Sequence, residues 1–157
     1  MARIFLSAGH GGFEDGAIDP GAVAGGTTEA EEMKRTRDLI EAELNNHGFT
    51  VLSVPDNLSL RETIRWINNR ADRGDVALEI HADAATPAAR GASAFFIAGN
   101  NERREDANVL LNAFLNGAGG VVKHGTGVKP DTEEKTWVSD GKTGKASAKD
   151  FERYFRY

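Results

Sequence analysis

The chain of 157 residues contains no cysteine, which excludes disulfide bonds, cysteine-bound zinc and thiol catalysis. It also lacks an apolar run near the roughly 18 residues that a membrane span requires. The first residues show no apolar segment typical of a signal peptide, so we expect none in this sequence. An excess of basic residues is missing too, because the formal net charge is −5. This balance argues against nucleic acid as a partner.

What the sequence does contain is an alternation of strand and helix signals. Short apolar runs predict strands over residues 3–8, 49–54, 76–81 and 91–98. The run over 76–81 is apolar almost to its end, as expected for a parallel strand covered on both faces. The alternation predicts an α/β fold, a three-layer domain over residues 1–157 with a mostly parallel central sheet flanked by helices. We expect this single domain to be a monomer.

Helical periodicity predicts three helices. The first follows the N-cap Thr28 and ends at Gly48, and the second follows Ser59 and ends at Gly74. A third helix is expected over residues 101–116. Apolar side chains at helical spacing are expected to face inward, and these are Met33, Leu39, Ile40 and Leu44, then Leu60, Ile64, Ile67 and Ala71, and finally Ala107, Leu110, Leu111 and Phe114.

The remaining segments show weaker patterns. Residues 9–27 contain seven glycines and are typical of a loop. A phosphate-binding loop is disfavoured, because Glu14 stands where a dinucleotide motif needs glycine and acidic side chains there repel phosphate. Residues 117–148 are rich in Gly, Lys, Thr and Asp and predict no strand, whereas residues 147–157 carry the pattern of a short helix.

Two histidines and one glutamate stand at the ends of the predicted elements. His10 follows the first strand, Glu29 lies in the first turn of the first helix, and His81 ends the third strand. The carboxyl ends of parallel strands share one edge of a sheet, and the long loop can return Glu29 to that edge. Two imidazoles and one carboxylate are a common catalytic zinc set that leaves a fourth position for water.

Each of these residues also has a simpler interpretation. His10 can be a solvated loop residue, Glu29 can be a carboxylate favoured by the helix dipole, and His81 can be a hydrogen-bonded histidine at a strand end. Spacing does not decide, because the gaps differ from the short H-E-x-x-H pattern. The residues alone therefore leave both the metal site and these structural roles open.

Several motifs in a fixed order resemble the zinc-dependent N-acetylmuramoyl-L-alanine amidases of bacterial cell-wall hydrolysis. The resemblance covers about residues 3–132. The motifs that carry it are Ser7-Ala8-Gly9-His10-Gly11-Gly12, Asp19-Pro20-Gly21-Ala22, Thr28-Glu29, Leu60 to Arg70, Ile80-His81-Ala82-Asp83-Ala84, Arg90-Gly91 and Gly127-Val128-Lys129-Pro130-Asp131-Thr132.

This resemblance implies one Zn²⁺ ion held by His10, Glu29 and His81. It implies hydrolysis of the amide between the lactyl group of N-acetylmuramic acid and the L-alanine of the stem peptide. Peptidoglycan is then the partner, and the bacterial cell wall, periplasmic or extracellular, is the place of action. A different metal-dependent peptidase or deacetylase would space its motifs differently.

The end of the chain departs from the family pattern. Members continue with a further apolar strand whose glutamate is the proposed general base, whereas residues 133–157 form an atypical tail without such a strand. Glu79 is the remaining candidate for the catalytic carboxylate, because the strand period places it on the same face as His81. It can act as a base or orient a ligand. The alternative function is an amidase-like module that binds cell wall or metal without cutting.

Overall fold

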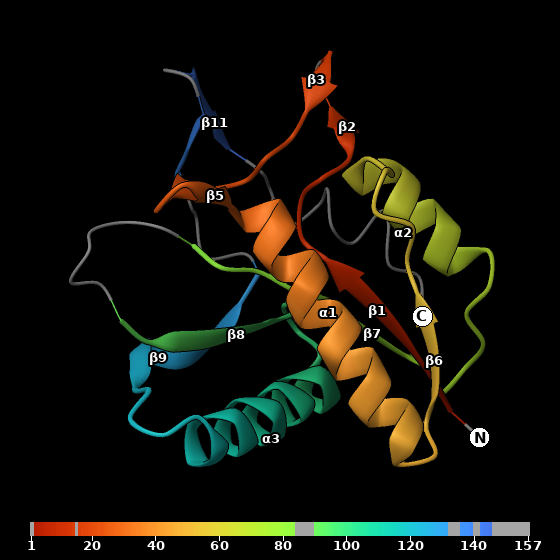
Figure 1. Cartoon of the computed structure of the whole chain (residues 1–157). Coiled ribbons are helices and arrows are strands. Elements are labelled where there is room, and N and C mark those ends of the chain that lie inside the picture. Colours follow the sequence, from red (N-terminus) through yellow and green to blue (C-terminus); the bar gives the residue numbers. More distant parts are fainter. Residues whose placement is uncertain (1, 15, 84–89, 132–135, 140–141, 146–157) are drawn as a thin grey trace. The chain divides into compact units, whose positions relative to one another are not determined.

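The computed structural model describes residues 2–14, 16–83 and 90–131, together with the backbone of residues 136–139 and 142–145. The chain divides into two compact units, Met1–Thr86 and Pro87–Arg156. Each unit has its own parallel strand pairing (Figure 1). The three residues that the sequence predicts as metal ligands all belong to the first unit.

A three-stranded parallel sheet forms the centre of the first unit. β1 (Arg3–Ala8) lies between β6 (Thr50–Ser53) and β7 (Val76–Ile80). Phe5 and Leu6 of β1 are fully buried. Because these neighbours point to opposite faces of the strand, β1 is covered on both sides. The predicted parallel sheet is therefore present, with β1 as its middle strand.

Two helices pack against this sheet. α1 (Glu29–Asn46) contacts β1 and β6 and runs across them (Figure 1). It begins where the Thr28 hydroxyl accepts a hydrogen bond from the Glu31 amide at 3.2 Å. α2 (Leu60–Asn68) begins at the predicted capping box of Ser59. These elements confirm the predicted α/β fold with a parallel sheet packed against helices.

The core beside α2 is built around β1. Phe5 packs with Val54 and with Ile67 of α2, and the ring of Phe5 meets the ring of Trp66 edge to face, with centroids 6.0 Å apart. Such pairs add to the stabilisation that comes from burying apolar area. This cluster attaches α2 to the middle of the sheet.

The segment predicted as a loop, residues 9–27, instead contains two antiparallel ribbons. β2 (Phe13–Glu14) pairs with β3 (Ala17–Ile18), and β4 (Val23–Ala24) pairs with β5 (Thr27–Thr28). The loop prediction is therefore wrong for these residues. The sequence did not reveal the strands because each has only two residues, which is too short to show an alternating pattern. Glycines with positive φ lie at the turns, as hairpins require, and these are Gly16, Gly25 and Gly26.

The second unit contains a parallel strand pair and one helix. β8 (Ala92–Phe96) pairs with β9 (Lys123–Pro130), and α3 (Asn101–Gly117) packs against both strands. β9 lies in residues 117–148, where the sequence pattern does not allow a strand to be placed. Its sequence, KHGTGVKP, lacks apolar alternation, and its register with β8 is irregular. Pairing with β8, rather than a local pattern, therefore accounts for this strand.

The same stretch contains two more strands. β10 (Thr136–Ser139) and β11 (Lys142–Lys145) pair as an antiparallel hairpin. The sequence did not predict them, because β11 consists of lysine, threonine and glycine, and the strand-favouring residues of β10 form a run of only three, Thr136, Trp137 and Val138. The short helix predicted over residues 147–157 lies outside the described residues.

The structure also corrects some predicted inward positions and boundaries. α2 ends at Asn68 rather than at Gly74, and the Arg70 carbonyl beyond it accepts a hydrogen bond from Arg3. β7 alternates between partly buried and exposed residues, so the face that carries Ala77 and Glu79 is open to solvent, contrary to the prediction that both faces are covered. The helices bury narrower faces than predicted, so four expected core side chains are exposed, namely Leu39, Leu60, Leu110 and Phe114.

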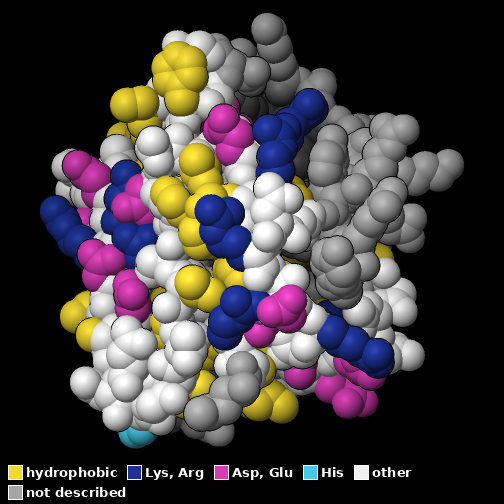
Figure 2. Space-filling view, turned by 90° about the vertical axis from the view of Figure 1, so that its right-hand side faces the viewer, with side chains coloured by type: hydrophobic (Ala, Val, Ile, Leu, Met, Phe, Trp, Pro, Cys, Tyr) yellow, Lys and Arg dark blue, Asp and Glu magenta, His cyan; other side chains and the backbone are white. Residues whose placement is uncertain are grey.

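Charged side chains of both signs are mixed on the face of the molecule seen in Figure 2. Lysine and arginine side chains alternate there with aspartate and glutamate, and apolar side chains lie between them. Within the part of the chain that the structure describes, no helix has both the length and the apolar character needed to cross a bilayer.

Candidate metal centre

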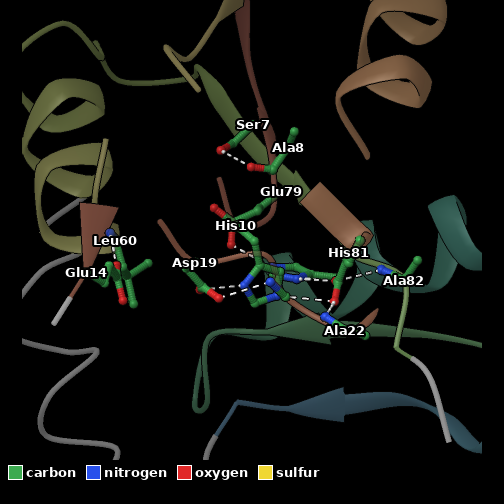
Figure 3. Close-up of polar contacts among 12 residues, drawn as sticks. Ser7, Ala8, His10, Glu14, Asp19, Ala22, Leu60, Glu79, His81 and Ala82 are labelled. Atoms are coloured by element: carbon green, nitrogen blue, oxygen red, sulfur yellow. Dashed lines mark hydrogen bonds and ion pairs between the residues drawn. The ribbon is translucent and has the colours of Figure 1, made fainter. Parts of the chain in front are cut away.

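The carboxyl ends of β1 and β7 and the first turn of α1 meet in the first unit (Figure 3). The Gly9 amide donates a hydrogen bond to the Ile80 carbonyl at 2.8 Å, which continues the pairing of β1 with β7. His10 and His81 follow these two residues directly, and Glu29 is the first residue of α1. The structure thus brings together the three residues that the sequence predicts as metal ligands.

Glu29 lies at the centre of this group, with a side chain only 2% exposed. Its Oε1 atom accepts a hydrogen bond from the Ala82 amide at 2.8 Å and lies 3.0 Å from Nδ1 of His81. Its Oε2 atom accepts from the Ala22 amide at 3.0 Å and lies 3.3 Å from Nε2 of His10. Each carboxylate oxygen therefore faces one main-chain amide and one imidazole.

The two imidazole rings stand nearly perpendicular to each other, with an angle of 87° and centroids 5.0 Å apart. Each ring also contacts a second carboxylate on its far side. Nδ1 of His10 lies 2.7 Å from Oδ2 of Asp19, and Nε2 of His81 lies 2.8 Å from Oε1 of Glu79. Figure 3 shows both outer carboxylates and their dashed contacts.

The backbone near the two histidine rings has an unusual conformation at His10 and packs closely against both rings at Gly9 and Gly21. His10 has φ of 65°, an uncommon conformation for a residue other than glycine. A Cβ atom on Gly21 would lie 2.5 Å from the His10 ring and 2.9 Å from Cβ of Glu29, and one on Gly9 would lie 2.4 Å from the His81 ring. Only glycine at these two positions leaves room for the ligand side chains.

The sequence did not reveal these supporting parts of the site. Main-chain amides such as those of Ala22 and Ala82 carry no signal in residue type. Gly9 and Gly21 lie within the motifs that carry the family resemblance, and that position is the only sequence signal for their role. Asp19 also lies in such a motif, but its contact with His10 was not predicted.

The surroundings of Glu29 favour its charged form. Burial raises the pKa of this carboxyl, but the amides of Ala22 and Ala82 and the neighbouring His10 outweigh that effect. The pKa of Glu29 therefore lies below its ordinary value. A charged carboxylate is the form that binds a metal ion.

The outer carboxylates differ in how they are held. Burial raises the pKa of Asp19, but the hydrogen bonds with His10 and with the Gly21 amide together outweigh burial, so the pKa lies below its ordinary value. The hydrogen bond to Glu79 is the largest cause of a raised pKa at His81. The contact with Glu79 therefore favours the protonated form of the His81 ring.

The donor set is suited to a metal ion. One ligand atom from each of His10, Glu29 and His81 lies within 4.8 Å of the others. Imidazole nitrogen and carboxylate oxygen are ordinary zinc ligands, and three protein ligands leave a position open for water or substrate. The amides on Glu29 and the outer carboxylates on both rings supply the supporting contacts that metal sites typically have.

Comparison with known proteins points to one family. The family model described as Amidase_3, N-acetylmuramoyl-L-alanine amidase, matches residues 4–142. The curated protein N-acetylmuramoyl-L-alanine amidase AmiC of Neisseria meningitidis serogroup B is 33% identical to this chain over 96 residues. That alignment covers 60% of this chain and 22% of AmiC, so the chain corresponds to a small part of that relative.

Solved structures show the same fold. AmiC2 of Nostoc punctiforme aligns with a TM-score of 0.66 and 20% identity, over 82% of this chain and 68% of that one. The catalytic domain of CwlV, an N-acetylmuramoyl-L-alanine amidase from Bacillus (Paenibacillus) polymyxa var. colistinus, aligns with a TM-score of 0.66 and 22% identity, over 83% and 70%. Because the family model spans most of the chain and includes the whole candidate metal centre, this chain belongs to the Amidase_3 family of N-acetylmuramoyl-L-alanine amidases.

Proposed function

We propose that this chain is a zinc-dependent amidase domain that cleaves the bond between N-acetylmuramic acid and L-alanine in peptidoglycan. The observation that carries the proposal is the convergence of His10, Glu29 and His81 in a chain of the Amidase_3 family. Membership in this family also supports action at the cell envelope. The bacterial cell wall, periplasmic or extracellular, is the proposed place of action.

In this proposal, the ion is held by one imidazole nitrogen from each histidine and by the carboxylate of Glu29. Bound zinc supplies a Lewis acid for the scissile carbonyl and lowers the pKa of a water molecule. The amides of Ala22 and Ala82 fix both oxygens of Glu29. The carboxylate is therefore already oriented before an ion arrives, and little reorganisation is needed on binding.

Hydrolysis consumes one water molecule. Its oxygen joins the lactyl carbonyl carbon, the C–N bond breaks, and a proton passes to the amine of L-alanine. A side chain that accepts and returns a proton is needed for this step. Glu79 is the candidate, since its carboxylate lies at the same sheet edge and 2.8 Å from Nε2 of His81. The same contact favours its second possible role, which is to orient His81.

A module that binds cell wall without cleavage is the second candidate function. The specific observation that favours it is the tail, residues 133–157, which lacks the apolar strand and glutamate that close the family pattern. A chain that keeps the metal ligands but has no efficient base would bind glycopeptide and turn it over slowly or not at all. Binding and turnover must therefore be measured separately.

Release of new L-alanine amino groups from purified cell walls tests the proposal. We expect zinc-loaded protein to release them, a chelator to stop the release, and added zinc to restore it. His81→Ala should be inactive, whereas His47→Ala should remain active, because His47 is 67% exposed and contacts Glu43 on α1. Walls that retain the zinc-loaded protein without any release would support the binding module and contradict the enzyme.

A further inference from the structure

The two histidines of the candidate metal centre present different ring nitrogens to Glu29. His10 faces Glu29 with Nε2 at 3.3 Å, while its Nδ1 lies 2.7 Å from Asp19. His81 is reversed, since it faces Glu29 with Nδ1 at 3.0 Å and its Nε2 lies 2.8 Å from Glu79. Each ring is thus placed between the shared central carboxylate and a carboxylate of its own.

The outer carboxylates determine where each ring carries its proton. An ionised carboxylate only accepts hydrogen bonds, so a neutral imidazole beside it must place its N–H on the nitrogen that faces it. The opposite nitrogen of each ring faces Glu29, and an ion bound between that nitrogen and Glu29 would take a lone pair from each of them. In His10 this nitrogen is Nε2, and in His81 it is Nδ1.

We propose that Asp19 and Glu79 are positioning residues that make His10 bind the ion through Nε2 and His81 through Nδ1. This inference rests on the proposed zinc site and extends it to two residues that touch the ion only through a histidine. Carboxylates in this position commonly fix the tautomer and the orientation of a ligand histidine. The two rings use different nitrogens because Asp19 faces Nδ1 of His10, whereas Glu79 faces Nε2 of His81.

The two positioning residues are not held equally well. Oδ1 of Asp19 accepts a hydrogen bond from the Gly21 amide at 3.0 Å, and the Asp19 main chain exchanges hydrogen bonds with Gly11 and Gly12. The side chains of Asp19 and Glu79 are almost equally exposed, at 35% and 36%, so the difference between them lies in these hydrogen bonds. A carboxylate that is fixed by further hydrogen bonds restricts a ring more firmly, so we expect Asp19 to contribute more to zinc affinity than Glu79.

Zinc affinity of the full chain, measured by competition with a chelator, gives the first test. We expect Asp19→Ala to weaken zinc binding about 10- to 100-fold and Glu79→Gln about 10-fold or less. Asp19→Glu should recover part of the loss. Asp83→Asn is the matched control, because it removes the same charge from an exposed position two residues beyond His81 and should leave affinity within about twofold.

Nuclear magnetic resonance of the zinc-loaded chain, labelled with ¹⁵N in its histidines, gives the second test. Long-range couplings identify the metal-bound nitrogen of each ring, and we expect Nε2 for His10 and Nδ1 for His81. A merely structural role for the outer carboxylates would not change this signature, whereas Asp19→Ala should alter it at His10. His47→Gln and His124→Gln assign the remaining signals.

The outcomes separate this inference from the proposed function. Zinc bound through the same type of nitrogen in both rings, or bound with unchanged affinity in the Asp19→Ala and Glu79→Gln variants, overturns the inference and leaves the amidase proposal standing. Zinc bound through the expected nitrogens by a chain that cleaves no cell wall upholds the inference and removes the enzyme. A full chain that binds no zinc overturns the inference together with the metal centre.

Discussion

At its amino end, the β1–β7 pair is closed by a guanidinium whose charge is permanent, whereas at its carboxyl end the carboxylates face imidazoles, whose charge depends on protonation. The Arg3 guanidinium donates hydrogen bonds to Asp75 at 2.6 and 3.0 Å, and the Arg3 amide donates to the same carboxylate at 2.8 Å. At the other end, the carboxylates of Asp19, Glu29 and Glu79 surround two histidines.

The two ends therefore differ in role. The contacts at the amino end stabilise the fold, whereas the groups at the carboxyl end are arranged as a candidate binding site. At the amino end, Arg3 always carries its charge and pairs with Asp75 and Asp72, so this contact forms without a ligand. Three carboxylates around two imidazoles exceed the positive charge available even when both rings are protonated. A divalent cation supplies the missing charge, which is why the carboxyl end is suited to metal binding.

The largest expected effect lies at the carboxyl end. Gly21→Ala places a Cβ atom 2.5 Å from the His10 ring and 2.9 Å from Glu29, so it displaces two ligands. We expect zinc affinity, measured by chelator competition, to fall about 1,000-fold, or about 4 kcal/mol. Gly25→Ala is the matched control, because Gly25 has φ of 61° against 64° for Gly21 and no atom within 4 Å of its added Cβ.

The control separates backbone strain from collision with the ligands. Both substitutions place alanine in a left-handed conformation, so both should lower thermal stability through backbone strain, and Gly21→Ala should lower it more because of its collision with His10 and Glu29. Equal zinc affinities of the two variants would contradict the role assigned to Gly21 and would locate the ligands elsewhere.

An intermediate effect is expected in the core that joins α2 to the middle of the sheet. Ile67→Ala removes a buried side chain that packs with Phe5, so the free energy of unfolding should fall by about 2–3 kcal/mol. Leu60→Ala, in the same helix but exposed, should cost less than about 1 kcal/mol. Zinc affinity of the folded protein should be unchanged in both, and a large decrease for Ile67→Ala would show that core and site are coupled.

The smallest effect is expected at the amino end, and it depends on pH. The hydrogen bond from Arg3 is the main reason why the pKa of Asp75 lies well below its ordinary value. Asp75→Asn should therefore lower the free energy of unfolding at pH 7. Stabilisation from a depressed pKa is present above the ordinary value of about 3.9 and is lost as pH falls toward the folded-state value, so the difference should shrink in that range.

Urea unfolding of wild type and Asp75→Asn from pH 7 downward measures this difference. Asp72→Asn is the control, since Asp72 also contacts Arg3 but its side chain is 86% exposed and should contribute little. A difference for Asp75→Asn that stays constant down to low pH would contradict an effect of its charge.

The sequence was sufficient to predict the parts of the molecule that local pattern controls. The apolar run that becomes β1, the N-caps Thr28 and Ser59 and the strand end at His81 all carry a signal in residue type. His10 and His81 could be placed together because the carboxyl ends of parallel strands share one edge of a sheet. The intervening segment is long enough to return Glu29 to that edge, but only the family resemblance implied that it is a ligand.

Features that depend on pairing or on distant contacts could not be predicted. β9 exists because it pairs with β8, although its own glycines and lysines disfavour a strand. The exposure of Leu60 depends on how far α2 is covered, and periodicity cannot measure that. The amides on Glu29 and the clearance at Gly21 are properties of the folded backbone, so residue type alone does not show them.

The candidate ligands are widely separated along the chain, and this has a consequence for how the protein unfolds. Glu29 and His81 are 52 residues apart in sequence, so the unfolded chain does not hold them together. A metal ion that needs both of them binds the native state alone and shifts the folding equilibrium by mass action. At a free zinc concentration 100 times the dissociation constant, this linkage adds about 2.7 kcal/mol to stability. The melting temperature of this chain should therefore rise with zinc concentration and serve as a titration of its site.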